Sequence, residues 1–310
     1  MSEQIKFGEN TFFRYRAFNE RSLEAFRNDK LFFSTPKHFN DPFDTLAYID
    51  TGKLFSSIGS DLNHMQSYLG TQISQNNHVP FPLVTDENKD FLLKFSEDPE
   101  NRKEFYAFVA KQADLLKEKI LANSKIICFS KEWLSMLMWS HYADYHRGFA
   151  LGYSVDSLTS ASLFDEKDNP VSQALTFLPV NYTENKPDMG EWFYNDLPKV
   201  YMGNAKISRN PFYLDLLKTK SPEWAYEKEY RLCSLPDDFE KTDPVTYAKA
   251  TPTVLFLGAK MEDKNRWELF KIAKKKKIAV FEVWTNETAP KYKLNFCKFD
   301  SRTLKKSYIL

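Results

Sequence analysis

The chain of 310 residues is long enough for one large domain or two, and the lack of an obvious linker favours a single domain over residues 1–310. Its 43 basic and 42 acidic side chains leave a net charge of +1, so no global field attracts nucleic acid. Hydrophobic residues, 42% of the chain, supply a packed core and exclude extensive disorder. The first residues, MSEQIKFGEN, contain no apolar segment and no run approaches a membrane span, so we expect a cytoplasmic protein without membrane partners.

The first part of the chain predicts two strands around a short helix. Residues 11–17 (TFFRYRA) have the composition of a strand, and Asn19 is placed to cap the helix that follows. Residues 30–35 (KLFFST) predict a second strand, which leads into a loop that ends in NDPFD at residues 40–44. The prolines and turn-forming side chains of this loop predict an ordered segment, which either closes a capped turn or contributes to a site.

A helical pattern follows over about residues 54–124, and we predict a helical insertion beside the sheet there. Residues 126–153 then predict a strand, a helix and a second strand in one aromatic-rich unit. Ser130 is placed to cap this helix, which we expect to run to about His146, with Gly148 as a left-handed cap. The helix mixes polar with apolar residues in a way that suits the lining of a pocket as well as a core; these polar and aromatic residues are Trp139, His141, Tyr142 and Asp144.

The last third of the chain adds strands at residues 174–182, 254–257 and 278–284, and a helix at 211–220. A further helix starts near Glu262 and ends in four lysines at residues 274–277. Helix-dipole compensation explains these lysines, and nucleic-acid contact is the alternative. Together the elements predict an α+β fold with a central mixed or split β-sheet and helical insertions.

The most chemically distinctive stretch is EKEYR at residues 227–231, predicted to follow a turn on a strand. Strand alternation would place Glu227, Glu229 and Arg231 on one face. Neighbouring carboxylates raise each other's pKa and Arg231 opposes that rise, so one Glu could stay ionised while the other is tuned for proton transfer. The alternative is an exposed strand face with a simple Glu–Arg pair.

Arg14 and Arg16 raise the same question, because they share one strand face and are either exposed to solvent or placed to clamp an anionic ligand. The sequence contains no P-loop, no GxGxxG, no GxSxG and no HExxH motif. The five histidines show no spacing that demands a metal, and we predict no metal site.

Four blocks of the sequence, FFRYRAFNE, KLFFSTPKHFNDPFD, IICFSKEWLSMLMWSHYADYHRGFALGY and KTKSPEWAYEKEYRL, together resemble the bacterial DUF2971 family of uncharacterised domains. They occur in family order between about residues 12 and 260. The family's motif residues correspond here to Tyr15, Arg16, Asn40, Asp41, Pro42, Asp44, Trp139, Tyr142, Gly148, Lys220, Trp224, Glu227, Glu229 and Arg231.

This arrangement is also distantly similar to ADP-ribosyltransferases, which place an Arg or His on an early strand, a Ser, Thr or Tyr on a second, and a Glu on a late strand. Arg16, Ser34 with Thr35, and Glu227 with Glu229 match these positions. The resemblance implies that NAD is a substrate and that its nicotinamide–ribose bond breaks through an oxocarbenium-like centre.

Under that resemblance Glu229 would stabilise the developing charge and Glu227 would orient or deprotonate the acceptor. Arg16 would hold the dinucleotide, and Trp139 or Tyr142 would stack on a ring. The hypothesis is thus an NAD-consuming transferase or NAD glycohydrolase, in the role of a bacterial toxin or phage-defence effector, with a protein or nucleic-acid acceptor.

Two other classes remain open. In a non-catalytic nucleotide or nucleic-acid sensing module, Arg14, Arg16 and Arg231 would bind phosphate. In a metal-dependent nuclease, the ligands would be the carboxylates of Asp41, Asp44, Glu227 and Glu229. The residues predicted for the enzyme are Glu229, Glu227 and Arg16 for catalysis, and Tyr15, Ser34, Asn40, Asp41, Asp44, Trp139, His141, Tyr142, Lys220 and Arg231 for substrate binding.

Overall fold

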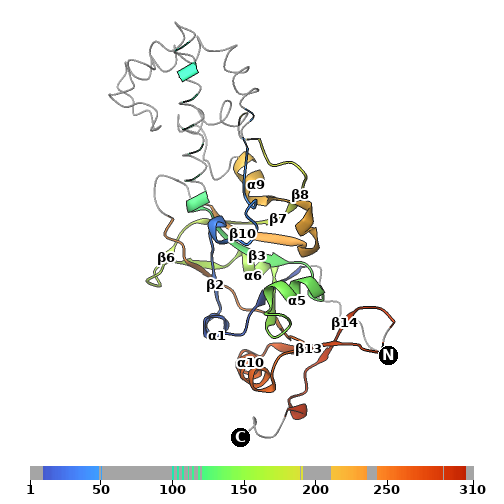
Figure 1. Cartoon of the computed structure of the whole chain (residues 1–310). Coiled ribbons are helices and arrows are strands. Elements are labelled where there is room, and N and C mark those ends of the chain that lie inside the picture. Colours follow the sequence, from blue (N-terminus) through green and yellow to red (C-terminus); the bar gives the residue numbers. More distant parts are fainter. Residues whose placement is uncertain are drawn as a thin grey trace.

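A computed structural model describes residues 10–48, 50, 121–188, 190, 211–235, 243–288 and 290–304, together with scattered helical positions between residues 100 and 118 (Figure 1). The helical insertion predicted at about residues 54–124 lies almost entirely outside these described residues. No helix in the described ranges combines the length and apolar character that crossing a bilayer requires.

A mixed sheet of eight strands organises the described part of the chain, in the order β14-β13-β12-β4-β1-β3-β10-β7. Only β12 and β13 pair in parallel within it. The strands are β1 (Thr11–Arg16), β3 (Lys125–Ser130), β4 (Phe149–Ser154), β7 (Ala174–Pro179), β10 (Glu229–Leu235), β12 (Val254–Leu257), β13 (Ala279–Thr285) and β14 (Leu294–Lys298). The α+β class with a central mixed sheet is therefore confirmed.

Two smaller sheets and the helices complete the fold. One sheet contains β2 (Lys30–Phe32), β11 (Tyr247–Lys249), β5 (Ser162–Phe164) and β6 (Pro170–Val171), and β8 (Asn181–Tyr182) pairs with β9 (Thr219–Lys220). The helices are α1 (Glu20–Arg27), α5 (Met136–Tyr142), α6 (Val155–Thr159), α9 (Pro211–Lys218) and α10 (Asp263–Lys276), with the 3-10 turns η1 (Pro36–His38), η3 (Pro222–Glu227) and η4 (Ser301–Thr303).

The large sheet divides between β1 and β3. Strand β1 pairs with β4 along its whole length, and β3 pairs with β10 over six residues, but β1 and β3 meet at the single pair Phe13 and Ser130. Beyond that pair the two strands separate, and Ser34 takes the place beside β3 at Ile126. We call the opening between residues 14–16 of β1 and residues 126–129 of β3 the fork.

Alternation along β1 divides its side chains between two cores. Phe12 lies in a core that contains residues of α1, α6 and α10, whereas Phe13 and Tyr15 lie in a second core with residues of α5. Helices therefore cover both faces of the sheet. By alternation Arg14 and Arg16 belong to the face of Phe12, at the end of β1 that β3 no longer accompanies.

The central strand–helix–strand unit is present, but its helix is shorter than predicted. Ser135 caps α5, and the predicted cap Ser130 instead ends β3 and accepts a hydrogen bond from the backbone N–H of Glu132. The chain leaves α5 through three left-handed residues, Asp144 to His146, with φ of 46°, 53° and 70°. The prediction of a left-handed Gly148 was wrong. Glycine is required there because a Cβ would lie 2.1 Å from the carbonyl oxygen of Arg16.

The stretch before β10 also differs from the prediction. Pro222 opens the 3-10 turn η3, which includes Glu227, and Lys228 is left-handed with φ of 43°. The strand therefore begins at Glu229, and the prediction that Glu227 shares its face was wrong. The predicted strand at residues 174–182 is interrupted between β7 and β8, and the predicted strand at 30–35 ends at Phe32.

Candidate functional site

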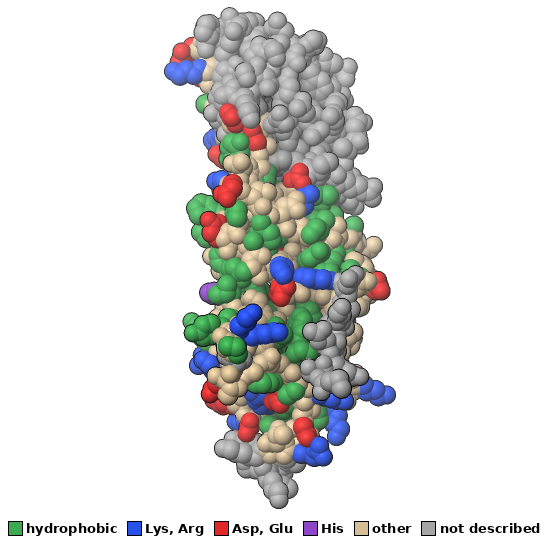
Figure 2. All heavy atoms as spheres, turned by 90° about the vertical axis from the view of Figure 1, so that its right-hand side faces the viewer, with side chains coloured by type: hydrophobic (Ala, Val, Ile, Leu, Met, Phe, Trp, Pro, Cys, Tyr) green, Lys and Arg blue, Asp and Glu red, His purple; other side chains and the backbone are tan. Residues whose placement is uncertain are grey.

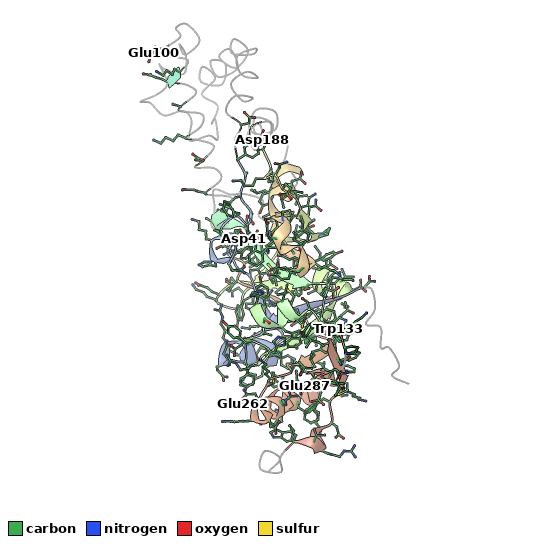
Figure 3. The ribbon with its side chains drawn as sticks, turned by 45° about the vertical axis from the view of Figure 1, so that its right-hand side comes forward. Asp41, Glu100, Trp133, Asp188, Glu262 and Glu287 are labelled. Carbon is green, nitrogen blue, oxygen red and sulfur yellow. The ribbon has the colours of Figure 1, made fainter. Side chains whose placement is uncertain are left out.

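A pocket of about 300 Å³ lies at the fork. Strands β1 and β3 form one side, α5 and the loop after η1 cover it, and β9, η3 and β10 form the opposite side. Asp41 in this loop lies in the upper half of the described part, whereas Glu262 and Glu287 lie in the lower half (Figure 3). The residues that line the pocket are Phe13, Arg14, Tyr15, Arg16, His38, Phe39, Asn40, Asp44, Cys128, Phe129, Ser130, Met138, Tyr142, Lys220, Glu227 and Glu229.

Arg231 holds two carboxylates in place behind the pocket. It is fully buried, and on β10 it shares a face with Glu229, to whose Oε1 its Nε donates at 2.9 Å. Its Nη2 donates to Oδ2 of Asp44 at 2.6 Å, and its Nη1 donates to the carbonyl oxygen of Leu217 at 2.7 Å. Since its donors are taken up by the protein, Arg231 positions carboxylates and is not available to a ligand.

Lys220, delivered by β9, connects both glutamates. Its Nζ donates to Glu227 at 2.6 Å and to Glu229 at 3.1 Å, and it lies 3.5 Å from Asp44. Together with Arg231 these residues form a buried cluster of two cations and three carboxylates. We call this cluster, Asp44, Lys220, Glu227, Glu229 and Arg231, the paired wall. With every group ionised its net charge is −1.

The two glutamates of the paired wall have different proton affinities. Burial alone would raise the pKa of Glu229, but Arg231 and Lys220 outweigh that effect and hold the pKa at about 2. Burial raises the pKa of Glu227, and the negative charge of Glu229 adds to the rise, although Lys220 opposes it. Environments that separate two carboxyl pKa values in this way are typical of acid–base sites.

Glu227 is also linked to the loop that covers the pocket. The hydroxyl of Tyr142 donates to Oε1 of Glu227 at 2.5 Å, and Nδ2 of Asn40 donates to that hydroxyl at 3.0 Å. Burial, followed by the charge of Glu227, raises the pKa of Tyr142, so this phenol is protonated at neutral pH.

The pocket lining also includes two arginines without carboxylate partners, whose side chains belong to the other face of the sheet from Glu229. Arg14 donates to the carbonyl oxygens of Cys128 at 3.3 Å and Phe32 at 3.4 Å, and its buried Nε has no partner. Arg16 has no hydrogen-bond or ion-pair partner anywhere in the described ranges. Burial lowers the pKa of both arginines. We call Arg14 and Arg16 the guanidinium side.

The structure brings most of the predicted site residues to this pocket and leaves others away from it. Tyr15 lines the pocket and donates to the carbonyl oxygen of Glu132 at 2.7 Å. Trp139 is fully buried in the core, where its Nε1 donates to the carbonyl oxygen of Trp133 at 2.9 Å. The pocket lining includes neither Ser34, which forms the bridge to β3, nor the exposed His141.

Asp41 also stays outside the lining, because its Oδ1 accepts from the N–H of Phe43 and closes a turn. Sequence reasoning missed several lining residues, which are Phe13, His38, Phe39, Cys128, Phe129, Ser130 and Met138. Most of them lie next to or within segments that the sequence analysis assigned to the site, so closeness to NDPFD and to the aromatic helix is the signal that could have identified them.

The described residues include no group of three or more His, Cys, Asp and Glu side chains arranged to hold a metal. Within the paired wall the Lys220 ammonium already lies among the three carboxylates. Helix α10, which ends in the lysine run, lies in the lower part of the view in Figure 1. Acidic and basic side chains are interspersed over the described part of the face in Figure 2.

Fold and site define an α+β protein with a charged pocket at the division of its main sheet. A family model described as a protein of unknown function (DUF2971) matches residues 138–232, from α5 to β10, which supports the resemblance to that family. The match includes the helix of Tyr142 and the strand of Glu229 and Arg231. No curated protein and no solved structure matches the chain significantly.

Proposed function

We propose that the pocket binds NAD and that the protein is an ADP-ribosyltransferase-like enzyme that breaks the bond between nicotinamide and ribose. The observation that supports this proposal is the charge of the pocket lining, which combines two guanidinium groups without a carboxylate partner, from the face of β1 that carries Phe12, with a cluster of net negative charge. NAD carries the complementary charges, since its pyrophosphate is anionic and its nicotinamide ring is cationic. Arg14 and Arg16 would bind the pyrophosphate, and the paired wall would face the nicotinamide ribose.

The pocket volume constrains how much of the dinucleotide is enclosed. About 300 Å³ is at the lower end of the range of about 300–1,000 Å³ for small-molecule sites. We therefore propose that the pocket encloses the nicotinamide half and that the adenosine half lies outside it.

The paired wall suits a reaction in which positive charge develops on ribose. Glu229, with a pKa of about 2, is ionised at neutral pH, so its charge is in place before the bond breaks. Arg231 and Lys220 offset part of that charge but leave the wall with a net charge of −1. We further propose that the protein acts as a toxin or phage-defence effector, either by consuming NAD or by modifying a target molecule.

The test is release of nicotinamide from NAD by the purified protein, with and without cell extract as a source of acceptor. Glu229→Gln keeps the shape of the side chain and removes its charge, so turnover should fall by about a hundredfold or more with a modest change in KM. Glu166→Gln, at an exposed position outside the pocket, is the matched control and should keep full turnover. Absence of release under every condition contradicts the proposal.

A non-catalytic nucleotide-sensing module is the second candidate, and one observation favours it. Arg231 and Lys220 occupy both oxygens of Glu229, an arrangement that a purely structural carboxylate would also have. In that case wild type and Glu229→Gln would bind ADP-ribose with similar affinity and neither would release nicotinamide. A nuclease is less well supported, because a metal would have to displace Lys220 from the carboxylates.

A further inference from the structure

We infer that Tyr142 and Glu227 form the proton-transfer unit of the pocket and that Asn40 is the residue that positions the Tyr142 hydroxyl. This inference rests on the proposed function, and it identifies the groups that take the proton from the acceptor. Three separate elements supply the residues: the loop after η1, the end of α5, and the end of η3.

The hydrogen bonds give the unit a direction. The side-chain amide of Asn40 donates to the Tyr142 oxygen, so the tyrosine proton must point away from Asn40. It points to Oε1 of Glu227, at an oxygen–oxygen distance of 2.5 Å. Glu227 is 4% exposed, whereas Tyr142 is half-buried. The phenol therefore lies between the carboxylate and the more open part of the pocket.

The other carboxylates of the paired wall are less suited to exchanging a proton. Both oxygens of Glu229 accept from Arg231, and one also accepts from Lys220. Asp44 accepts from Arg231 on one oxygen and from Thr45 on the other. Glu227 shares one oxygen with Lys220 and offers the other to Tyr142, so it alone among the three contacts a hydroxyl that lines the pocket.

The reaction step balances as follows. The C1′–N bond of the nicotinamide ribose breaks, and its electron pair leaves on the nicotinamide nitrogen. The acceptor oxygen forms a bond to C1′ and loses its proton to the Tyr142 oxygen, while Tyr142 passes its own proton to Glu227. Water in the acceptor position gives hydrolysis by the same transfer. Glu227 ends neutral, a form that its buried position favours.

The pH dependence follows from the groups around Glu227. These are Lys220 on β9, Glu229 on β10, Tyr142 on α5, Tyr182 on β8 and Tyr226 on η3. His38 and Asp44 line the same pocket, and Arg231 pairs with Glu229. Glu227 must be ionised to accept a proton, so turnover rises with pH through the pKa of Glu227. Donation by Tyr142 lowers that pKa. Its removal should therefore move the rise in turnover to higher pH.

The first experiment does not require activity. Carbon-13 NMR of protein labelled at the glutamate side-chain carboxyl gives the titration of Glu227, assigned with Glu227→Gln, in wild type and in Tyr142→Phe. We expect the midpoint to move to higher pH in Tyr142→Phe. Tyr226→Phe is the control, because Tyr226 is close to Glu227 but donates no hydrogen bond to it, and its midpoint should stay near the wild-type value. An unchanged midpoint in Tyr142→Phe overturns the inference.

The second experiment measures nicotinamide release against pH. Tyr142→Phe should lower kcat by about a hundredfold, with the rise in turnover displaced to higher pH. Asn40→Ala should lower kcat less, with a smaller displacement in the same direction and an unchanged KM. Release by Tyr142→Phe at the wild-type rate and pH profile overturns this inference alone. No release from wild type overturns the proposed function and the proton transfer together, so the two failures are distinguishable.

Discussion

The two sides of the pocket handle buried charge in opposite ways. On the paired wall each ionic group has an opposite charge within 4.0 Å, and the ions lie almost fully out of solvent. On the guanidinium side Arg14 reaches only carbonyl oxygens, and Arg16 has no polar partner among the described residues.

This difference separates residues that build the site from residues that are available to a ligand. A buried charge is costly unless it is paired, so the ion pairs of the paired wall offset the cost of burying its charges between β9, η3 and β10. Arg14 and Arg16 are half-buried without a carboxylate partner, so an anion from outside would offset the cost of their partial burial. The comparison therefore predicts that Arg231 of the paired wall and Arg16 of the guanidinium side respond differently to the same substitution.

The largest effect is expected for Arg231→Ala, which should lower the free energy of unfolding by about 3–5 kcal/mol. Its removal leaves Glu229 and Asp44 buried without their main partner. Urea unfolding followed by circular dichroism measures the change. Arg147→Ala, which removes an arginine from an exposed ion pair with Asp144, should leave the unfolding midpoint unchanged. Equal losses for the two variants would contradict the division into paired and available arginines.

Acid should weaken the paired wall through Glu229. Its pKa is depressed in the folded protein, from 4.5 to about 2, so the folded state binds this proton less readily than the unfolded state. The resulting stability is fully present above about pH 4.5 and is lost as pH falls toward about 2; it amounts to about 3 kcal/mol. Urea unfolding at a series of pH values measures it. Glu229→Gln should lose less stability across this window than wild type does, and identical slopes would argue against the ion pair.

Removal of Arg16 tests the guanidinium side. Arg16→Ala should weaken binding of ADP-ribose by about 1.5–3 kcal/mol, or about ten- to a hundredfold, because a charged hydrogen bond to phosphate is lost. The free energy of unfolding should stay the same or rise, since an unpaired buried charge is removed. Calorimetry and urea unfolding give the two values. Lys264→Ala, at an exposed position on α10 outside the pocket, should change neither. A loss of stability without a loss of affinity in Arg16→Ala would contradict the comparison.

The sequence was sufficient for elements whose signal is local. Apolar and aromatic runs identified β1, β4 and β12, and Asn19 caps α1 as predicted, with its side chain accepting from the N–H of Ser22. The fork could not be predicted in this way. It depends on which strands pair and where β1 and β3 separate, and these contacts join residues more than 100 positions apart.

The prediction that Glu227 belongs to the site was right about the pocket but wrong about the element that carries the residue. Glu227 was expected beside Glu229 through strand alternation, whereas it reaches the same wall from η3 through the left-handed Lys228. Lysine has no side-chain preference for that conformation, so the residue type gave no sign of it. Trp139 shows the converse error, because an aromatic residue on a mixed helix suits a pocket or a core equally, and here the core holds it.

The smallest expected effect concerns the NDPFD loop, whose two acidic residues have different roles. Asp44 belongs to the paired wall, while Asp41 only closes a turn through the N–H of Phe43 at 2.9 Å. Asp41→Ala should therefore cost about 1 kcal/mol of unfolding free energy, as the loss of one turn hydrogen bond does, and leave ADP-ribose affinity intact. The second carboxylate oxygen of Asp41 is buried without a partner, which limits the loss further. Urea unfolding and calorimetry on Asp41→Ala and Asp44→Ala, side by side, check this. If Asp41→Ala folds normally but binds ADP-ribose as weakly as Arg16→Ala, Asp41 contacts the ligand directly. The assignment of Asp41 to a turn outside the pocket would then be wrong.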